Sequence, residues 1–560
     1  MKYTDPTIGA ALSQQAPLNT LDDAGQGILA QHSRQDDIIQ TLHGYGLDSN
    51  LLRHLKDQSS QSPSCKDACE VLARHFPHQV ITKGMSRRYQ EFVGSYWSQQ
   101  QIDVHPHCIF IPFAPQDVAV QVLTCQLFAC HFSVKSGGHA SFAGASSVQS
   151  GITVSLERLD EITVSEDRKL VAIGMGNRWG DVYEKLEEYD LTVIGGRDAD
   201  VGVGGYTLGG GMSFFSNLYG WACDNVAQYE IALANGTILQ ASQNSHAGLY
   251  RALRGGSDNF GVVTKIWMDA YPLEGGVMAA GGGSTSDSKS FGALLDAFVD
   301  LATRGAELDG KANQILTFQS IVDDTGKDLK TTGYAGLVYA EGLTEGVLPG
   351  VFEPYRRVLH PRNEPPPGTS APQRLLLNTT LRYMVAQGPI GQPAGRRNTY
   401  WTKTFTLSRE SMQIALDVFL ETTRAIQMSG SVKELTVALM LQPITTPILQ
   451  SMMKRGGNSL GLDNGPPRLT ATSVMSWVDA TDDDMVMRVN EQLVGTWEKQ
   501  GIQQGLEDRF VYMNYAARKQ RVVEGYGAKS RENLVRVAHE YDPGSVFQKL
   551  VTGYQKLGME

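Results

Sequence analysis

The chain has 560 residues, which is too long for a single hydrophobic core and predicts two or three domains. Its net charge of -10 argues against nucleic acid as a partner, because phosphate binding needs a surplus of Lys and Arg on one face. The six cysteines form no Cys-x-x-Cys pair, so no metal site is predicted, and we interpret them as buried or free thiols.

Residues 1–102 are interpreted as an N-terminal extension with no chemistry of its own. They are polar at first and then show a short helical pattern through Cys65, Cys69 and Leu72. The first thirty residues have neither the basic start nor the apolar run of a secretory signal. No stretch is apolar over the length of a spanning helix, so we expect a cytoplasmic protein without membrane contact.

Residues 103–273 show the alternation of strands and helices that is typical of an α/β domain. Strands are predicted at 109–112, 132–135 and 152–156, and a helix at 116–129. Glycine-rich turns follow at 137–144, 195–211 and 255–261.

Residues 274–509 have a different character and predict a second domain. After a glycine-rich break at 275–283, runs of β-branched and aromatic residues predict a largely antiparallel sheet with strands at 315–321, 333–340, 398–407, 434–442 and 468–480. Helices predicted at 409–428 and 484–499 would cover this sheet. The Pro-rich segment 360–372 is expected to be a surface loop, and residues 510–560 form a C-terminal segment.

The segment Lys135-Ser136-Gly137-Gly138-His139 follows the second predicted strand and combines an anion site with a nucleophile. Adjacent glycines lack Cβ atoms, so their N–H groups can converge on phosphate oxygens. The neighbouring imidazole is able to attack the C8 methyl group of a flavin. Taken alone, the segment is equally compatible with an ordinary glycine turn beside a solvated histidine.

The glycine clusters do not match the common nucleotide-binding fingerprints. Gly202 and Gly204 begin a Gly-x-Gly-x-x-Gly pattern, but Thr207 stands where its last glycine belongs. No Gly-Lys-Ser/Thr sequence follows any cluster. A ligand that contacts several separate glycine turns is long and extended. FAD fits, because its pyrophosphate needs N–H donors and its ring needs a flat, close approach.

The glycine clusters and later motifs occur in a fixed order along the chain, at 135–144, 195–197, 201–205, 208–211, 219–226, 254–263, 512–515 and 541–543. Together they resemble the FAD-linked oxidases of the vanillyl-alcohol-oxidase superfamily, and within it the fungal type of the berberine-bridge-enzyme-like branch. The resemblance covers residues 85–556. It implies an α+β protein with a two-domain PCMH-type FAD-binding fold, in which 103–273 and 510–560 build the FAD domain and 274–509 the substrate domain.

The resemblance also implies that FAD is the cofactor and is attached covalently through His139. Some members add a second bond from a cysteine, but Asp198 stands at that position here, so we expect one bond. The implied contacts to pyrophosphate, ring, adenine end and oxygen path are Lys135, Ser136, Gly137, Gly138, Gly144, Val201, Gly202, Gly204, Gly205, Gly210, Gly261, Val263 and Asn514.

Candidate catalytic residues come from the end of the chain and from one strand. Tyr512, Asn514 and Tyr515 match an element that returns to the flavin in this branch, where substrate oxidation needs a base. A tyrosine base needs a nearby cation or donor to ionise at neutral pH, and the sequence identifies none. A buried tyrosine with a satisfied hydroxyl is the alternative. Gln442 is a candidate substrate-facing group. Tyr400, Trp401 and Lys403 lie on a predicted strand and are candidate pocket residues for an aromatic substrate, although such aromatic residues more often belong to a core.

The expected activity is that of an oxidase. It takes a hydride from a small organic molecule, such as a secondary-metabolite intermediate, and passes the electrons to O2 to give H2O2. The alternatives are a dehydrogenase of the same fold that does not use O2, and a flavin-bearing cyclase without net redox change.

Overall fold

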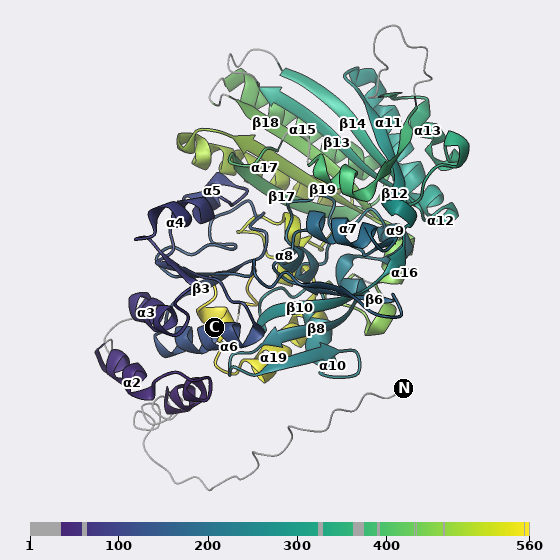
Figure 1. The fold of residues 1–560 in the computed structure, drawn as a ribbon. Coiled ribbons are helices and arrows are strands. Elements are labelled where there is room, and N and C mark those ends of the chain that lie inside the picture. Colours follow the sequence, from purple (N-terminus) through teal and green to yellow (C-terminus); the bar gives the residue numbers. More distant parts are fainter. Residues whose placement is uncertain are drawn as a thin grey trace.

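The computed structural model describes residues 35–58, 64–322, 329–361, 374–388, 392–429, 432, 434–462, 465–553 and 555–558. Two domains are visible in Figure 1, with the N-terminal half below and a broad sheet above. Among the described residues, none of the helices combines the length and the apolar character needed to cross a bilayer.

The first domain contains a small mixed sheet that carries the Gly-Gly-His segment. Its strand order is β1 (Val80–Thr82), β2 (Cys108–Phe110), β4 (Ile152–Ser155) and β3 (Phe132–Lys135). β4 runs parallel to both β2 and β3. Helix α6 (Pro115–Leu127) makes the crossover from β2 to β3. The predicted α/β alternation is confirmed, and β1 of the expected extension pairs with β2.

A second, antiparallel sheet lies beside the first and positions the later glycine turns. Its strand order is β5 (Ile162–Val164), β6 (Leu170–Gly174), β10 (Val262–Asp269), β8 (Val226–Ala232) and β9 (Ile238–Ser242). Strands β7 (Leu191–Thr192) and β11 (Tyr271–Pro272) form a separate pair. Besides α6 and the helical residues 35–44, the helices of this half include α2 (Ser49–Gln58), α3 (Cys65–His75), α4 (Ser86–Val93), α5 (Gln99–Ile102), α7 (Trp179–Glu187), α8 (Val203–Leu208), α9 (Ser216–Tyr219) and α10 (Ala247–Leu253).

The second domain is built on a large antiparallel sheet, as predicted. Its strands are, in spatial order, β15 (His360–Pro361), β12 (Val277–Thr285), β14 (Leu329–Tyr339), β13 (Ala312–Val322), β18 (Leu435–Ile444), β19 (Arg468–Trp477), β17 (Arg397–Thr406) and β20 (Glu507–Asp508), while β16 (Leu376–Thr380) pairs with β12. Most of the predicted Pro-rich loop 360–372 lies outside the described residues.

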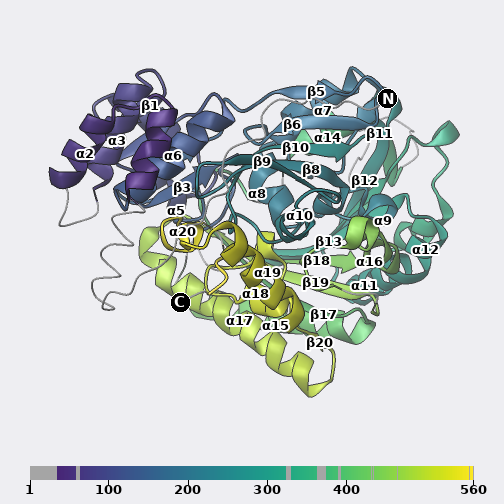
Figure 2. The same cartoon turned by 90° about the horizontal axis from the view of Figure 1, so that it is seen from below.

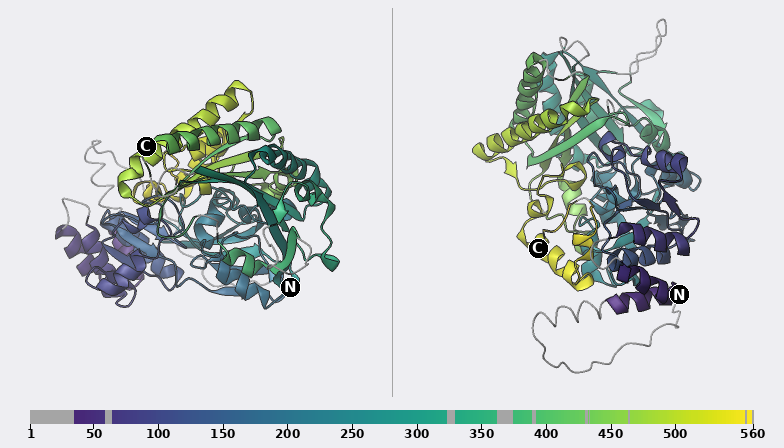
Figure 3. Two further views of the ribbon diagram at one scale, coloured as in Figure 1. Left: turned by 90° about the horizontal axis from the view of Figure 1, so that it is seen from above. Right: turned by 90° about the vertical axis from the view of Figure 1, so that its left-hand side faces the viewer.

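Long helices cover one face of this sheet and leave the other turned toward the first domain. Figure 3 shows α15 (Arg409–Ser429) and α17 (Asp483–Gln503) lying across the outer face, next to α11 (Phe291–Asp300). The alternation along β18 explains the arrangement, because Leu439 and Leu441 belong to the core under the helices, whereas Met440 points the other way. Shorter helices are α12 (Ala306–Leu308), α13 (Glu353–Arg356), α14 (Leu381–Ala386) and α16 (Thr446–Ser451). The predicted fold class is confirmed.

The prediction of a glycine-rich break at 275–283 is wrong for most of its length, because residues 277–283 belong to strand β12 and only Gly275 and Gly276 lie in the turn before it. A Cβ atom at Gly281 would lie 2.4 Å from the carbonyl oxygen of Leu375. At Gly282 it would lie 1.9 Å from that of Ala335. The glycines therefore allow neighbouring strands to approach closely, and they do not interrupt the sheet.

The C-terminal segment returns to the first domain. Figure 2 shows α18 (Val522–Gly525), α19 (Ala528–Tyr541) and α20 (Val546–Lys549) packed beside it, with α19 next to α10. Phe132 of β3 donates to the carbonyl of Leu550 at 2.9 Å and accepts from the N–H of Thr552 at 3.0 Å. The end of the chain thus extends the sheet that carries the Gly-Gly-His segment.

Four cysteines form disulfide bonds, which corrects their interpretation as buried or free thiols. Cys65 pairs with Cys130, and Cys69 pairs with Cys108. Both bonds link helix α3 to the small mixed sheet and the segment beside it, so this helix is fixed to the first domain. Cys125 and Cys223 are free and buried, as expected.

We expect two of the six cysteines to react with a thiol reagent when the protein is denatured without reductant, and all six after reduction. Six reactive thiols without reductant would contradict both pairs. Disulfides are rare in cytosolic proteins, so this count also bears on the cytoplasmic location that the sequence predicts.

Candidate functional site

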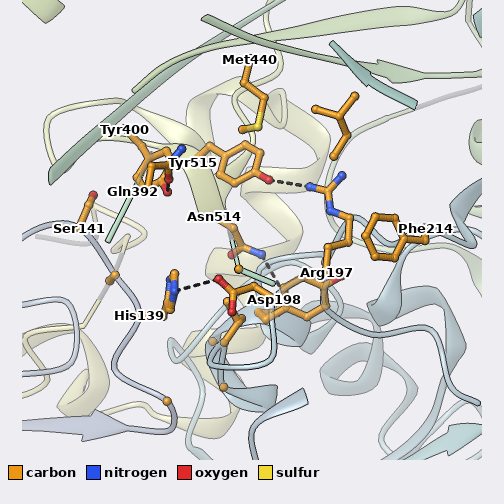
Figure 4. A pocket seen from close by; sticks show the side chains of 18 of the residues that line it. His139, Ser141, Arg197, Asp198, Phe214, Gln392, Tyr400, Met440, Asn514 and Tyr515 are labelled. Atoms are coloured by element: carbon orange, nitrogen blue, oxygen red, sulfur yellow. Dashed lines mark hydrogen bonds and ion pairs between the residues drawn. The ribbon is translucent and has the colours of Figure 1, made fainter. Parts of the chain in front are cut away.

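A cavity of about 1090 Å³ lies between the glycine-rich turns of the first domain and the uncovered face of the large sheet. The C-terminal element Tyr512–Tyr515 forms part of its wall, and Figure 4 shows this region from close by. Among the predicted site residues, those that line the cavity are Ser136, Gly137, Gly138, His139, Val201, Gly202, Gly204, Gly205, Gly261, Val263, Tyr512, Asn514 and Tyr515. The fold therefore brings together three distant parts of the sequence.

Two glycine segments form a bare backbone cradle at one end of the cavity. A Cβ atom at Gly137 would lie 2.4 Å from the amide nitrogen of Gly202, so neither glycine segment of the cradle tolerates a side chain at this contact. A Cβ atom at Gly205 would meet nothing within 4 Å, because that position opens into the cavity. The N–H groups of Gly137, Gly138 and His139 donate to no acceptor among the described residues. This cradle fits the pyrophosphate of FAD, which offers the missing acceptors.

His139 is held by a carboxylate and by an aromatic ring. Its Nε2 lies 3.4 Å from Oδ2 of Asp198, and each side chain is 16% exposed. Asp198 is anchored in turn, because its Oδ1 accepts from the N–H of Asp200 at 2.9 Å. Burial raises the pKa of Asp198, but the hydrogen bond and charge of His139 outweigh it and hold that pKa below its ordinary value. The Nδ1 side of the imidazole has no such partner among the described residues.

Trp97 fixes the plane of the His139 ring. The indole stacks on the imidazole with ring centroids 4.5 Å apart and planes inclined by 14°. The N–H of Trp97 also donates to the carbonyl of Gly138 at 3.1 Å. Sequence reasoning missed Trp97, because nothing in its local pattern separates it from an ordinary buried aromatic residue. The predicted N-terminal extension therefore contributes directly to the site.

Tyr512 and Asn514 are structural members of the C-terminal element. The Tyr512 hydroxyl accepts from the N–H of Met212 at 3.0 Å and from Nδ2 of Asn514 at 3.1 Å. Asn514 also donates to the carbonyl of Tyr206 at 3.0 Å. Burial raises the pKa of Tyr512, so its hydroxyl stays protonated at neutral pH.

Tyr515 has the cationic neighbour that the sequence did not identify. Nη2 of Arg197 donates to its hydroxyl oxygen at 2.7 Å, as Figure 4 shows. The two residues are 318 positions apart, so no local signal connects them. The Tyr515 ring is T-shaped against Tyr512 and stacks on Tyr400, with centroid distances of 5.0 and 5.7 Å. Arg197 therefore places a cationic hydrogen-bond donor on the hydroxyl of a tyrosine that lines the cavity.

The sheet closes the cavity above the C-terminal element. Tyr400 of β17 lines it as proposed, and its hydroxyl donates to Gln392. Met440 of β18 points down toward Tyr515. Trp401 and Lys403 do not line the cavity: Trp401 packs in the core under the helices, and Lys403 pairs with acidic residues of α17 and β20.

Four predicted site residues do not line the cavity: Lys135, Gly144, Gly210 and Gln442. A Cβ atom at Gly210 would contact the ring of Trp221 at 2.9 Å, so this glycine serves packing. Gln442 is buried one row beyond Met440 on β18, opposite Thr470, and its amide has no partner among the described residues. Lys135 points into an aromatic pocket, with Nζ 4.8 Å from the ring centroid of Phe92.

We expect Lys135→Met to raise the midpoint of thermal unfolding by a few degrees at pH 7. Burial lowers the pKa of Lys135 to about 8 from its ordinary value of 10.5. Between pH 8 and pH 10.5, Lys135 is therefore protonated to a greater extent in the unfolded chain than in the folded protein. Its destabilising effect on the fold is complete below pH 8 and decreases as the pH rises toward 10.5. The gain should therefore shrink in scans toward pH 10.5. A gain independent of pH would contradict this account, and exposed Lys529→Met serves as the control.

Residues 106–242 match the family described as an FAD binding domain. The chain is 34% identical over 515 residues to the FAD-dependent monooxygenase tpcD of Cochliobolus heterostrophus, covering 88% of this chain and 94% of the relative. The chain belongs to the PCMH-type FAD-binding family. This FAD-linked oxidoreductase is also 30% identical over 498 residues to the FAD-dependent monooxygenase sdcF of Emericella nidulans, covering 87% of this chain and 98% of the relative.

Solved structures share the fold of this oxidoreductase. Berberine bridge enzyme, as a variant in complex with (S)-reticuline, superposes with a TM-score of 0.67 at 16% identity, over 87% of this chain and 99% of that chain. Glucooligosaccharide oxidase of Acremonium strictum, described with a 6-S-cysteinyl, 8α-N1-histidyl FAD, has a TM-score of 0.66 at 18% identity, over 88% and 99%. These likenesses show that the chain has the fold that the resemblance to the berberine-bridge-enzyme-like branch implies.

Proposed function

We propose that this oxidoreductase is an oxidase of secondary metabolism, which takes a hydride from a small organic molecule and passes the electrons to O2 to form H2O2. FAD, when bound, accepts the hydride and delivers two electrons to O2. The observation that carries the proposal is the contact between Arg197 and Tyr515 at 2.7 Å, because it fixes the hydroxyl of Tyr515 in the cavity beside the flavin cradle.

Tyr515 acts as the base in this proposal. It takes a proton from the substrate while the hydride leaves the substrate carbon, so the substrate loses two electrons and two hydrogens in total. Arg197 positions the oxygen of Tyr515 through the hydrogen bond at 2.7 Å. Tyr512 and Asn514 hold the element in place through the contacts with Met212 and Tyr206.

His139 is proposed to hold FAD covalently, through Nδ1 of the imidazole. Asp198 accepts a hydrogen bond from Nε2, so the proton sits on Nε2 and the lone pair on Nδ1 is left to react. The new bond would replace one C–H bond of the C8 methyl group and the N–H bond of the imidazole, and Asp198 would take the imidazole proton. Bound FAD, together with O2, would supply the two-electron oxidation that this replacement requires. The stacked Trp97 ring keeps the imidazole from rotating.

The names of the relatives favour a second candidate function, because tpcD and sdcF are described as FAD-dependent monooxygenases. In a monooxygenase, one atom of O2 enters the substrate and the other leaves as water. The dehydrogenase and the non-redox cyclase, the other two alternatives, are distinguished by the oxygen experiment described next.

The oxygen reaction is tested without knowing the substrate. The holoenzyme is reduced photochemically without air and then mixed with air-saturated buffer. We expect the flavin colour to return at once, with H2O2 formed in an amount equal to the flavin. A flavin that stays reduced in air would identify a dehydrogenase and overturn the proposal. In turnover with a substrate, H2O2 well below the product formed would indicate a monooxygenase, and flavin that never bleaches without air would indicate a cyclase.

A further inference from the structure

Strand β14 contains a glycine that neither packing nor backbone conformation requires. Gly336 lies within the strand, and its φ is not positive. A Cβ atom there would make ordinary van der Waals contacts, at 3.6 Å from the ring of Tyr334 and 3.9 Å from the carbonyl oxygen of Ile315. Gly333 on the opposite face of β14 differs, because a Cβ atom there would lie 2.9 Å from the side chain of Leu294. Packing therefore explains Gly333 but not Gly336.

A glycine inside a strand weakens the fold unless another contact makes use of it. It loses more conformational freedom on folding than other residues do, and it offers no side chain to its neighbours. Where packing does not demand it, a strand glycine marks a place at which another group approaches the backbone closely. Gly336 lines the cavity, so the group that approaches it comes from the cavity.

The neighbours of Gly336 form an apolar bay in the wall of the cavity. Gly282 of β12 and Ile315 of β13 stand directly opposite it on the two adjacent strands. Tyr334 and Val338 lie two positions away on β14 and therefore point to the same face. All five residues line the cavity, and Figure 1 shows their three strands next to one another. We call Gly282, Ile315, Tyr334, Gly336 and Val338 the glycine bay.

The wall around the glycine bay carries no charge. Among the described residues between 274 and 509, those that line the cavity include no Asp, Glu, Lys, Arg or His. The polar neighbours of the bay on the same face are the neutral side chains of Ser284, Asn313 and Thr317. A charged group in the bay would lose its hydration without gaining a partner, so this part of the cavity disfavours ionised ligands.

We propose that the glycine bay binds an apolar part of the substrate and that Gly336 determines how large this part is. The substrate is then a neutral molecule with a ring or a branched alkyl group, which lies against the bare backbone of Gly336. This inference rests on the proposed function, which places the substrate in this cavity. A sugar needs several hydrogen-bonding partners, whereas the bay offers it one side-chain hydroxyl, that of Tyr334.

A series of neutral alcohols tests the glycine bay in the oxidised holoenzyme. Benzyl alcohol and its 4-methyl, 4-isopropyl and 4-tert-butyl derivatives differ only in apolar size, and difference spectra of the flavin measure their Kd. We expect the native enzyme to bind about fourfold more tightly for each added carbon that the bay accommodates. Gly336→Ala should reduce this gain, and Gly336→Val should abolish it for the two branched derivatives. Thr332→Val keeps the volume on the same face of β14 and should leave the gain unchanged.

Thermal unfolding without ligand separates the glycine bay from an ordinary packing site. Since a Cβ atom fits at position 336, Gly336→Ala should unfold at the native temperature or above it. Gly333→Ala is the matched control on the same strand and should unfold at a lower temperature, because Leu294 would have to move. A lower unfolding temperature for Gly336→Ala would show that packing needs this glycine, which contradicts the inference.

The binding series gives results that would overturn the assignment. Equal gains for each carbon in the native enzyme and in Gly336→Val would do so, as would a native enzyme that gains nothing from the larger alcohols. If Gly336→Val weakens the binding of cellobiose and leaves that of the alcohols unchanged, the bay is a sugar site and the apolar assignment is wrong. Photochemical reduction and reoxidation in air need no substrate, so a failure there bears on the proposed function and not on the glycine bay.

Discussion

We expect Tyr515→Phe to lower the rate of anaerobic flavin reduction by about ten- to ten-thousandfold, the range typical for loss of a general base. The physical reason is that Tyr515 is the proposed base, and its hydroxyl is held in the cavity by the guanidinium of Arg197 at 2.7 Å. Phe keeps the stacking on Tyr400 and removes only the oxygen. Stopped-flow absorbance with any substrate that bleaches the flavin measures this rate.

Tyr512→Phe is the matched control for this measurement. Its hydroxyl accepts from Met212 and Asn514, and burial raises its pKa, so it cannot serve as the base at neutral pH. We expect this variant to lose stability and to change flavin reduction far less than Tyr515→Phe does. A larger loss of rate in Tyr512→Phe than in Tyr515→Phe would exchange the two roles.

We expect Asp198→Ala to slow covalent attachment of FAD about ten- to hundredfold, the effect of losing one charge-assisted hydrogen bond. Without the carboxylate, no group holds the imidazole proton on Nε2. The tautomer that leaves a lone pair on Nδ1, which is the nucleophilic form, is then populated less. His139→Ala should still fold and bind FAD, but with no covalent fraction. The fraction is measured by acid precipitation, as flavin in the pellet against flavin in the supernatant, over time after FAD is added to apoprotein.

Asp200→Ala controls for disturbance of the loop, because this exposed carboxylate pairs with Arg178 and does not contact His139. It should attach FAD at the native rate. If Asp198→Ala and Asp200→Ala attach FAD equally fast, the carboxylate of Asp198 has no part in attachment.

Strongly periodic segments were predictable from the sequence. The five predicted strands of the large sheet and the helices α15 and α17 begin and end within a few residues of their predicted bounds, because one face of each is apolar and packs in a single core. Strand β12 was not predictable, since its glycines are required by the approach of Leu375 and Ala335, which only the folded chain reveals. The two disulfide pairs were not predictable either, because their cysteines are separated by 65 and by 39 positions in the sequence.

The candidate site also has one part that was predictable from the sequence and one part that was not. The backbone cradle around Gly137 and Gly202 was predictable, because glycine clusters mark places where only bare backbone fits. Arg197 and Trp97 were not, because their roles depend on contacts with Tyr515 and His139 that the fold creates from distant segments. Side chains that act through such long-range contacts leave no local pattern.

The central claim is that this cavity holds FAD bonded to His139, and mass spectrometry of the tryptic peptide 136–158 tests it most directly. Lys135 and Arg158 bound this peptide, and His139 is its only histidine. We predict that the peptide from native protein carries the mass of FAD less two hydrogens, with fragments that place it on His139. An unmodified peptide from yellow protein, with all flavin released on denaturation, would contradict the account.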